Sequence, residues 1–210
     1  MTGKIILIGG DEITKNETSR IDDEIRRSHP KGAVFLFVPT AAGDSEGYIA
    51  SMKRLFGKRF RVRVLRGTDG AKAAKEKIMA ADVIYLGGGK TELLRTFFKR
   101  WNLIPLLKRA HKNGATIIGM SAGAEALSLN YAVVKRSAWK LRGGWGIAPV
   151  ICLVHAKPTS AKQAFRYVRR QRSKKGKTFV AIGERAAWEI RVTDVRALGR
   201  GSVWVDGLPY

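Results

Sequence analysis

The sequence predicts an α/β fold in three layers: a doubly wound, mainly parallel β-sheet with helices on both faces. Short apolar runs alternate along the chain with segments of helical periodicity, which is the pattern of consecutive strand and helix units. Hydrophobic residues make up 45% of the 210 residues, and no internal repeat, low-complexity tract or linker interrupts them. We therefore expect a single domain over residues 1–210.

The expected strands are short, and most of them end at a glycine or a polar residue. Ala33–Val38 is apolar throughout, as a strand buried on both faces should be, whereas Arg61–Leu65 alternates and is expected nearer an edge. Two late segments, Trp188–Val192 and Ser202–Val205, are expected as antiparallel additions. The remaining expected strands are Lys4–Ile8, Val83–Leu86, Ala115–Ile118, Val150–Val154 and Phe179–Ile182.

Apolar positions at helical spacing indicate two of the helices. The first is expected to be capped by Asn102, with Pro105 in its first turn and Gly114 at its end. Its apolar face consists of Leu103, Leu106, Leu107 and Ala110. The second is expected to begin at a capping box formed by Ser160 and Gln163, with an apolar stripe of Ala161, Ala164, Phe165 and Val168. Its opposite face is basic and carries Lys162, Arg166, Arg169 and Arg170.

The chain is strongly basic. It has 40 Lys and Arg against 17 Asp and Glu, which gives a formal net charge of +23. From Ala126 to Gly183 there is no acidic residue, while the same stretch holds 13 Lys or Arg. Such a field attracts polyanions and acidic ligands, although a solvated basic surface accounts for it equally well. No zinc-finger, RNP-type or basic-zipper pattern occurs, so nucleic acid is a possible but not a favoured partner.

Several classes of protein are excluded or disfavoured by simple features. No apolar run approaches the roughly 20 residues of a bilayer span, and the N-terminus lacks the features of a signal peptide. Cys152 is the single cysteine, which excludes an internal disulfide and a multi-cysteine zinc site. We expect a cytoplasmic protein without membrane partner, metal or cofactor.

The sharpest motif is Gly119-Met120-Ser121-Ala122-Gly123, which matches G-x-S-x-G between an expected strand and a helical pattern. A serine on such a strand-to-helix turn takes a strained conformation, and flanking glycines let the strand and helix approach each other. Ser121 is therefore the expected nucleophile of a serine hydrolase. The alternative is a glycine-rich turn with an inert serine.

A serine hydroxyl needs a base, and the base needs an acid that orients it. His155 follows an apolar strand, at the end where open α/β sheets form their sites. His29 and His111 are expected to be solvated. Glu184 also follows a strand and is the expected acid, and Glu125, one helical turn after Ser121, is the runner-up. A structural role for His155 and a surface position for Glu184 are the alternatives.

Three consecutive glycines, Gly87 to Gly89, follow another strand and are expected to supply N–H groups to an oxyanion hole. Gly88, Gly89 and Ala122 are the candidates for this hole. The run Gly89-Lys90-Thr91 is similar to the end of a phosphate-binding loop, but the first glycine of that motif is replaced by Ile84. A nucleotide-hydrolysing site is therefore disfavoured.

Taken together, these residues resemble peptidase family S51, which includes aspartyl dipeptidase (peptidase E) and cyanophycinase. The likeness is clearest from Ala81 to Leu127, where Ala-Asp-Val-Ile-Tyr-Leu-Gly-Gly-Gly leads to Ile-Ile-Gly-Met-Ser-Ala-Gly-Ala. Phe-Val-Pro-Thr-Ala-Ala, Val-His and Ala-Ile-Gly-Glu are similar as well. The resemblance implies a flavodoxin-like fold of the class I glutamine amidotransferase type, with serine as nucleophile and histidine as base.

The resemblance also implies hydrolysis of the peptide bond after an aspartyl residue, so a small acidic peptide is the expected substrate. In the dipeptidase branch a basic residue downstream of the histidine meets the acidic side chain. Arg169 matches best by position, with Arg166 and Arg170 nearby, and an arginine fork suits a carboxylate. A solvated basic helix face is the alternative. Lys90 stands where the family has Asn or Asp, and it is a further candidate for substrate binding.

Other departures leave alternatives open. The dipeptidase branch has an aspartate about fifteen residues after the serine, where this chain has Arg136, so Glu184 is the expected third member, as in the cyanophycinase branch. His155 is followed by Ala156 instead of Phe. A catalytically altered scaffold that binds nucleic acid or another polyanion is the alternative function. The chain is expected to be a monomer or a homodimer.

Overall fold

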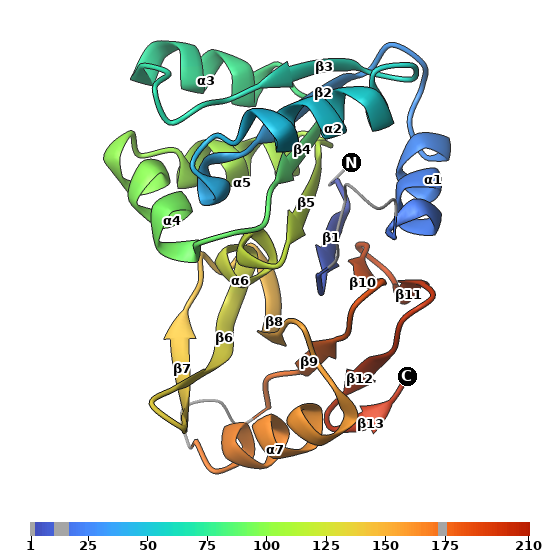
Figure 1. Cartoon of the computed structure of the whole chain (residues 1–210), viewed down its shortest axis with the longest axis vertical. Coiled ribbons are helices and arrows are strands. Elements are labelled where there is room, and N and C mark those ends of the chain that lie inside the picture. The colour runs from blue at the N-terminus through green and yellow to red at the C-terminus, as the bar shows by residue number, and fades with distance from the viewer. Residues whose placement is uncertain (1–2, 11–16, 172–175) are drawn as a thin grey trace.

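A computed structural model describes residues 3–10, 17–171 and 176–210, and it has two β-sheets (Figure 1). The first sheet has seven strands in the order β11-β10-β1-β5-β4-β2-β3. Its strands are β1 (Ile5–Ile8), β2 (Val34–Val38), β3 (Arg61–Val64), β4 (Val83–Leu86), β5 (Thr116–Met120), β10 (Ala186–Ile190) and β11 (Val195–Gly199). The pairs from β1 through β5, β4 and β2 to β3 are parallel, and β10 runs antiparallel to β1.

Helices cover both faces of the first sheet because its strands alternate between two cores. Leu7 and Leu86 belong to one apolar cluster, which includes side chains of α3 (Ala71–Met79), α4 (Thr91–Arg100), α5 (Ile104–Lys112) and α6 (Ala122–Leu127). Ile8 and Tyr85 belong to the other, which includes side chains of α1 (Ser19–Arg27) and α2 (Glu46–Phe56). This is the period of two that a pleated strand imposes. The expected three-layer α/β fold is confirmed.

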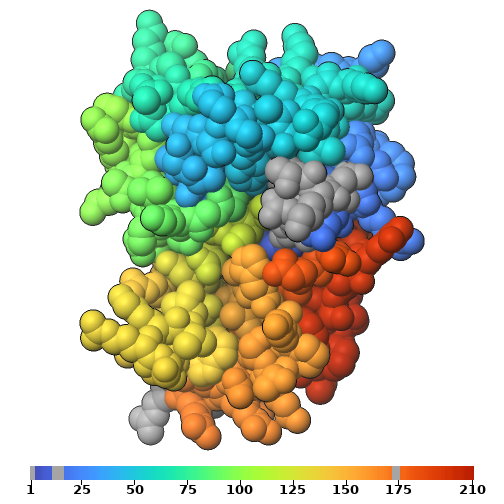
Figure 2. All heavy atoms as spheres, in the orientation of Figure 1, coloured from blue at the N-terminus to red at the C-terminus, as the bar shows by residue number. Residues whose placement is uncertain are grey.

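The expectation of one sheet is wrong in detail, because the later strands form a second one. It has six strands in the order β13-β12-β9-β8-β6-β7. They are β6 (Ser128–Lys135), β7 (Ala138–Gly143), β8 (Ala148–Leu153), β9 (Phe179–Ile182), β12 (Val203–Val205) and β13 (Leu208–Pro209). The hairpin of β6 and β7 was not predicted. In Figure 2 the blue-to-green part of the chain lies mostly above the yellow-to-red part, which carries the second sheet together with β10 and β11 of the first.

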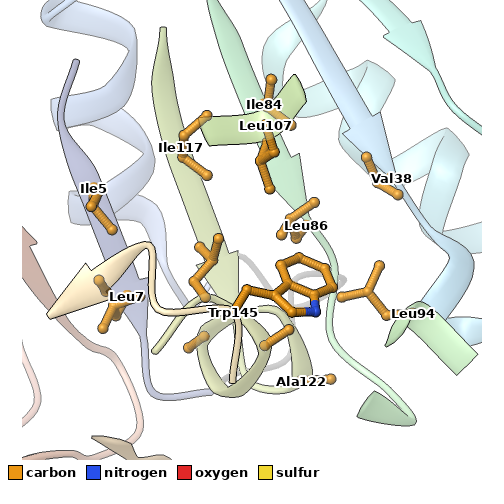
Figure 3. Close-up of a cluster of buried hydrophobic side chains, with 14 of the residues drawn as sticks. Ile5, Leu7, Val38, Ile84, Leu86, Leu94, Leu107, Ile117, Ala122 and Trp145 are labelled. Atoms are coloured by element: carbon orange, nitrogen blue, oxygen red, sulfur yellow. The ribbon is translucent and has the colours of Figure 1, made fainter. Parts of the chain in front are cut away.

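The two sheets share a core. Val150, Cys152 and Val180 of the second sheet belong to the same buried cluster as Leu7 and Leu86 of the first. Trp145, in the loop between β7 and β8, extends into this cluster beside Leu86, Leu94 and Ala122 (Figure 3). Its ring stacks on Phe98 with the centroids 4.6 Å apart. The opposite face of the second sheet is covered by α7 (Pro158–Arg169).

Strand positions agree with the sequence to within a few residues, and both late segments are antiparallel as expected. Arg61–Val64 lies at the edge of the first sheet, also as expected. The remaining element is a 3₁₀ turn, η2 (Thr40–Ala42). Within the described ranges, every helix is too short or too polar to span a bilayer.

Two predicted helix caps are wrong. Leu103, and not Asn102, occupies the cap position of α5, while Asn102 has a left-handed φ of 50° just before it. The helix after His155 begins at Pro158, so Ser160 lies inside its first turn and accepts a hydrogen bond from the Lys157 N–H at 2.9 Å. Pro105 lies in the first turn of α5 as expected.

Candidate active site

Ser121 lies on a tight turn between β5 and α6. Its backbone angles, φ 49° and ψ −107°, belong to a region that side-chain-bearing residues rarely adopt, and such strain is typical of functional turns. Its N–H donates to the Ile8 carbonyl at 2.9 Å, so the turn continues the pairing of β5 with β1. Ser121 stays partly exposed at the end of the sheet.

The two glycines of the motif have the predicted steric role. A Cβ on Gly119 would lie 2.4 Å from the carbonyl carbon of Gly123, so strand and helix could not cross this closely. A Cβ on Gly123 would lie 2.4 Å from the Leu86 carbonyl oxygen on β4. Larger residues at either position would push α6 away from the sheet and move Ser121.

The structure brings the three expected residues together in a hydrogen-bonded chain, called here the Ser–His–Glu chain. Ser121 Oγ lies 2.7 Å from His155 Nε2, and His155 Nδ1 lies 2.6 Å from Glu184 Oε1. The side chains of His155 and Glu184 are 50% and 52% exposed. Both links fall in the range of good hydrogen bonds although the groups remain accessible to solvent.

The three residues follow strands that belong to two different sheets. Ser121 follows β5 of the first sheet, while His155 and Glu184 follow β8 and β9 of the second. The site therefore lies where the ends of the two sheets meet, near the middle of the molecule in Figure 1. His155 itself has a left-handed φ of 52°, as does Arg185 beside Glu184 with a φ of 60°.

Gly9 and Gly10, which the sequence marked only as the end of β1, hold this junction together. The Gly9 carbonyl accepts from the His155 N–H at 3.0 Å, and the Gly10 carbonyl accepts from the Arg185 N–H at 3.2 Å. A Cβ on Gly10 would lie 2.2 Å from His155 Cε1 and 2.7 Å from Glu184 Oε2. Only a residue without a side chain leaves room for the imidazole and the carboxylate at this point.

The predicted oxyanion candidates lie around the same turn. A Cβ on Gly88 would lie 3.6 Å from Ser121 Cβ, so the glycine loop abuts the serine. Ala122 is the first residue of α6, where helical geometry leaves N–H groups without an intrahelical acceptor. Gly89, with φ 131°, packs its Cα against the backbone of Ala41. The Gly88 N–H donates to the Tyr48 hydroxyl at 3.3 Å, a neighbour that the sequence did not reveal.

Glu125, the runner-up acid, faces a different partner. Thr91 Oγ1 donates a hydrogen bond to its carboxylate, and burial raises the pKa of this carboxyl. In the described part of the chain it makes no hydrogen bond to His155. Glu125 therefore connects α6 to the start of α4 through its hydrogen bond with Thr91, and Glu184 is the acid beside the imidazole.

His29 and His111 are partly buried, contrary to the expectation that both are solvated. His29 Nδ1 lies 2.8 Å from the Ile25 carbonyl and its Nε2 lies 2.9 Å from Thr116 Oγ1. Burial lowers the pKa of both His29 and His111. The Cys152 thiol is fully buried, and burial raises its pKa, which makes it a poor nucleophile.

Three of the basic residues expected to bind substrate lie near the end of α7, and the fourth, Lys90, lies at the start of α4. Arg166, Arg169 and Arg170 are exposed near the end of α7, and Arg169 lies over the Phe165 ring, 5.7 Å from its centroid. At 1.5 Å per residue, Arg169 is about 16 Å along the helix from Pro158. Lys90 is exposed at the start of α4, next to the glycine loop. Among the described residues none of the four has a hydrogen bond to the Ser–His–Glu chain.

Arg136 lies at the turn between β6 and β7, with a left-handed φ of 50°. It replaces an acid of the dipeptidase branch, and in this chain Glu184 occupies the position next to His155. Of the 13 cationic residues between positions 126 and 183, Arg172, Lys174 and Lys175 lie outside the described residues. Within the described ranges, no group of three or more His, Cys, Asp or Glu is arranged to hold a metal ion.

Comparisons with known proteins identify relatives of this chain. The chain is 35% identical over 104 residues to the uncharacterized peptidase YgaJ of Bacillus subtilis (strain 168), a match that spans 49% of this chain and 44% of that relative. The structure is similar to a peptidase from an acI-B1 Actinobacterium, with a TM-score of 0.68 and 25% identity over 100% of this chain and 93% of the other.

A second solved structure, a candidate peptidase E protein from Listeria monocytogenes EGD-e, has a TM-score of 0.70. It is 20% identical, with 96% of this chain and 100% of the other covered, and this likeness concerns the fold. The family model described as peptidase family S51 matches residues 5–198, which is most of the chain. The chain therefore belongs to peptidase family S51.

Proposed function

We propose that the protein is a serine peptidase that hydrolyses the peptide bond after an aspartyl residue, in Asp-X dipeptides or related acidic amides. The Ser–His–Glu chain is the observation that carries this proposal. Its links of 2.7 Å and 2.6 Å arrange a hydroxyl, an imidazole and a carboxylate in the order that activates a serine. The family resemblance supplies the preference for aspartate.

The first half of the reaction follows from this order. When His155 carries its proton on Nδ1 and donates a hydrogen bond from that N–H to the Glu184 carboxylate, Nε2 can accept the proton of Ser121. The serine oxygen then forms a bond to the scissile carbonyl carbon, and the carbonyl oxygen becomes an oxyanion. Collapse of this intermediate breaks the C–N bond, the amine leaves with the proton from Nε2, and an acyl-enzyme ester remains.

Water completes the cycle. His155 Nε2 takes a proton from a water molecule whose oxygen attacks the ester carbon. Collapse of the second tetrahedral intermediate releases the carboxylic acid and returns the proton to Ser121. Glu184 keeps its charge throughout and stabilises the imidazolium that forms twice in each cycle.

The oxyanion is proposed to accept hydrogen bonds from the Gly88 and Ala122 N–H groups, with Gly89 shaping the loop. Gly88 abuts Ser121, Ala122 follows it in the chain, and the N–H of a first helical residue has no intrahelical acceptor. Because the Gly88 N–H donates to the Tyr48 hydroxyl, the oxyanion would share or replace that partner. Tyr48 therefore becomes a further residue of interest at this site.

The acidic side chain of the substrate would meet a basic residue. Arg169 is the candidate that the resemblance gives, together with Arg166 and Arg170, and Lys90 lies beside the glycine loop. The position of the three arginines near the end of α7 means that they would act on a substrate that extends along this helix. The net charge of +23 favours an acidic substrate in either case.

The alternative, a catalytically altered scaffold that binds nucleic acid, drew on the net charge and on the departures at Lys90 and Arg136. The Ser–His–Glu chain favours the enzyme, because neither Lys90 nor Arg136 is one of its three residues.

Turnover of Asp-X dipeptides is the experiment that tests the proposal. Wild-type protein should hydrolyse them, and Ser121→Ala should lower kcat by at least 1,000-fold, on the order of the losses seen when a serine nucleophile is removed. Ser128→Ala, a serine on the same segment with its hydroxyl bonded to the Glu125 carbonyl at 2.7 Å, is the matched control. Equal rates in wild type and Ser121→Ala would end the proposal.

A further inference from the structure

A cationic groove lies between the start of α4 and the hairpin of β6 and β7. Its volume is about 710 Å³, and it is called here the hairpin groove. One acidic residue, Glu92, lines it, together with five cationic side chains from both of its walls: Arg95, Lys135, Arg136, Lys140 and Arg142. Five positive charges against one negative charge leave a surplus of four.

Neutralisation inside the hairpin groove is weak. The nearest approach between Glu92 and Arg142 is 3.8 Å, and their side chains are 69% and 42% exposed. An exposed ion pair at this distance contributes little and leaves both groups available to a ligand. The groove therefore favours a ligand that carries several negative charges.

One wall of the groove is the edge of a sheet. β7 is the outermost strand of the second sheet in the described part of the chain, and it pairs with β6 alone (Figure 1). An edge strand presents backbone N–H and C=O groups that another extended polypeptide can pair with. A nucleic acid cannot reproduce this ladder, so the edge favours a peptide over a phosphodiester chain.

The side chains of β7 alternate in a way that matches this use. Trp139 and Leu141 pack against the core beneath α7, whereas Lys140 and Arg142 are exposed. In an added strand, side chains at every second position point to the same face. Acidic residues at alternate positions would therefore face the exposed cations of the hairpin groove.

The start of α4 links residues that line the hairpin groove to residues near the candidate active site. Glu92 follows Thr91, whose hydroxyl donates to Glu125 one helical turn after Ser121. Lys90, just before them, is separated by one residue from Gly88, which abuts Ser121. About one turn after Thr91 on α4, the Arg95 guanidinium donates a hydrogen bond to the Gly143 carbonyl, which connects this helix to the end of β7.

We propose that the hairpin groove binds an extended acidic peptide as an added strand on β7, and that acidic polypeptides longer than a dipeptide are the preferred substrates. This inference rests on the proposed peptidase function for its catalytic part. Cations on an edge strand also protect a protein from edge-to-edge aggregation. That role alone would give no preference for one polyanion over another.

Binding is tested first in the Ser121→Ala background, so that no probe is consumed. The probe is a fluorescein-labelled octapeptide of alternating Glu and Thr, read by fluorescence anisotropy at low salt. The double variant Lys140→Thr/Arg142→Thr should bind at least tenfold more weakly. The control Lys72→Ala/Lys75→Ala removes the same charge from exposed positions on α3 and should change the affinity less than twofold. Equal losses in the two double variants would overturn the proposal.

Two competitors distinguish backbone pairing with β7 from electrostatic attraction to the cations of the hairpin groove. The same peptide with N-methyl groups on alternate backbone nitrogens keeps its charges but cannot pair along a strand edge, and it should compete at least tenfold more weakly. A ten-nucleotide RNA should also compete weakly. If the N-methylated peptide or the RNA competes as well as the parent peptide, the groove is a general polyanion surface and the proposal fails.

Hydrolysis then tests the catalytic part. The ratio of kcat/KM for an Asp-X peptide with a Glu-Thr extension to that for the Asp-X dipeptide should exceed ten in wild type. It should fall toward one in Lys140→Thr/Arg142→Thr and stay high in the α3 control. A ratio near one in wild type would overturn the substrate preference. Tight binding without hydrolysis of either peptide would uphold the groove and contradict the proposed function instead.

Discussion

The two sheets contribute to the candidate site in different ways. In the first sheet, β1, β5, β4 and β2 are buried along their whole length, and the nucleophile turn is fixed by close packing of β5, α6 and β4. In the second sheet, His155 and Glu184 stand on surface turns and are about half exposed. The serine is thus held by the core, whereas its proposed base and acid are held by hydrogen bonds at the rim.

This difference shows where the site is vulnerable. A change in the packing around Ser121 disturbs the fold, because a Cβ added to Gly119 or to Gly123 would lie 2.4 Å from the nearest backbone atom. A change around His155 meets flexible side-chain atoms, so the fold can survive while the alignment is lost. Substitutions around His155 and Glu184 should therefore lower activity more than they lower stability.

Among the substitutions that leave Ser121 in place and compare the two regions, the largest effect on kcat is expected from the acid, Glu184. Glu184→Gln should lower kcat by about 100-fold or more, because an amide cannot stabilise the imidazolium and can favour the wrong tautomer. Glu125→Gln is the matched control and should cost less than about tenfold, since Glu125 bonds to Thr91 and not to His155. Steady-state kinetics on Asp-X dipeptides measure both. A larger loss in Glu125→Gln than in Glu184→Gln would show that Glu184 is not the acid of the site.

An intermediate effect is expected from Gly10→Ala. The added Cβ would lie 2.2 Å from His155 Cε1, so we expect kcat to fall at least tenfold. The φ of 156° at Gly10 adds backbone strain for alanine, so the thermal midpoint should also fall by several degrees. Gly70→Ala is the control, because a Cβ at Gly70 meets no atom within 4 Å. Parallel kinetics and thermal unfolding separate the two effects. Unchanged kcat in Gly10→Ala would show that the glycine does not position the imidazole.

The smallest effect on kcat is expected from Asp22, a buried carboxyl on α1 that lies outside the Ser–His–Glu chain and acts on stability. Burial raises its pKa from 3.8 to about 6, while Thr18 donates a hydrogen bond to it at 2.9 Å. The carboxyl is protonated in both folded and unfolded states below pH 3.8, and its ionisation cost is fully present above about pH 6. Stability is therefore lost as the pH rises through this window.

Asp22→Asn keeps the hydrogen-bonding shape without the charge. At pH 8 it should raise the free energy of unfolding by about 2 to 3 kcal/mol relative to wild type, with little difference near pH 4. Asp23→Asn, half exposed on the same helix, is the control and should shift stability by less than about 1 kcal/mol. Urea unfolding at both pH values gives the comparison. An equal gain at pH 4 and pH 8 would contradict the ionisation account.

Much of the candidate site could be predicted from the sequence, because its residues follow strands. Ser121, His155 and Glu184 each come just after an apolar run, and the carboxyl ends of parallel strands gather at one edge. That rule holds within one sheet, and it does not account for the approach of β5 to β8 and β9, because these strands belong to different sheets.

The features that were missed depend on contacts between distant residues. Gly9 and Gly10 looked like the end of a strand, and their role emerges only with His155 against them. Tyr48 reaches Gly88 from another helix, and His29 bonds to Thr116 across 87 positions. The local cap signals at Asn102 and Ser160 failed because each helix begins a short distance from the residue that matched the pattern.

The most direct test of the central claim is covalent labelling with a serine-directed fluorophosphonate, followed by peptide mapping. Wild-type protein should carry one adduct on the peptide that contains Ser121, and the labelling rate should fall at least 100-fold in His155→Ala, because the imidazole is the proposed base. Absence of label on Ser121, or labelling at the same rate without the imidazole, would contradict the account.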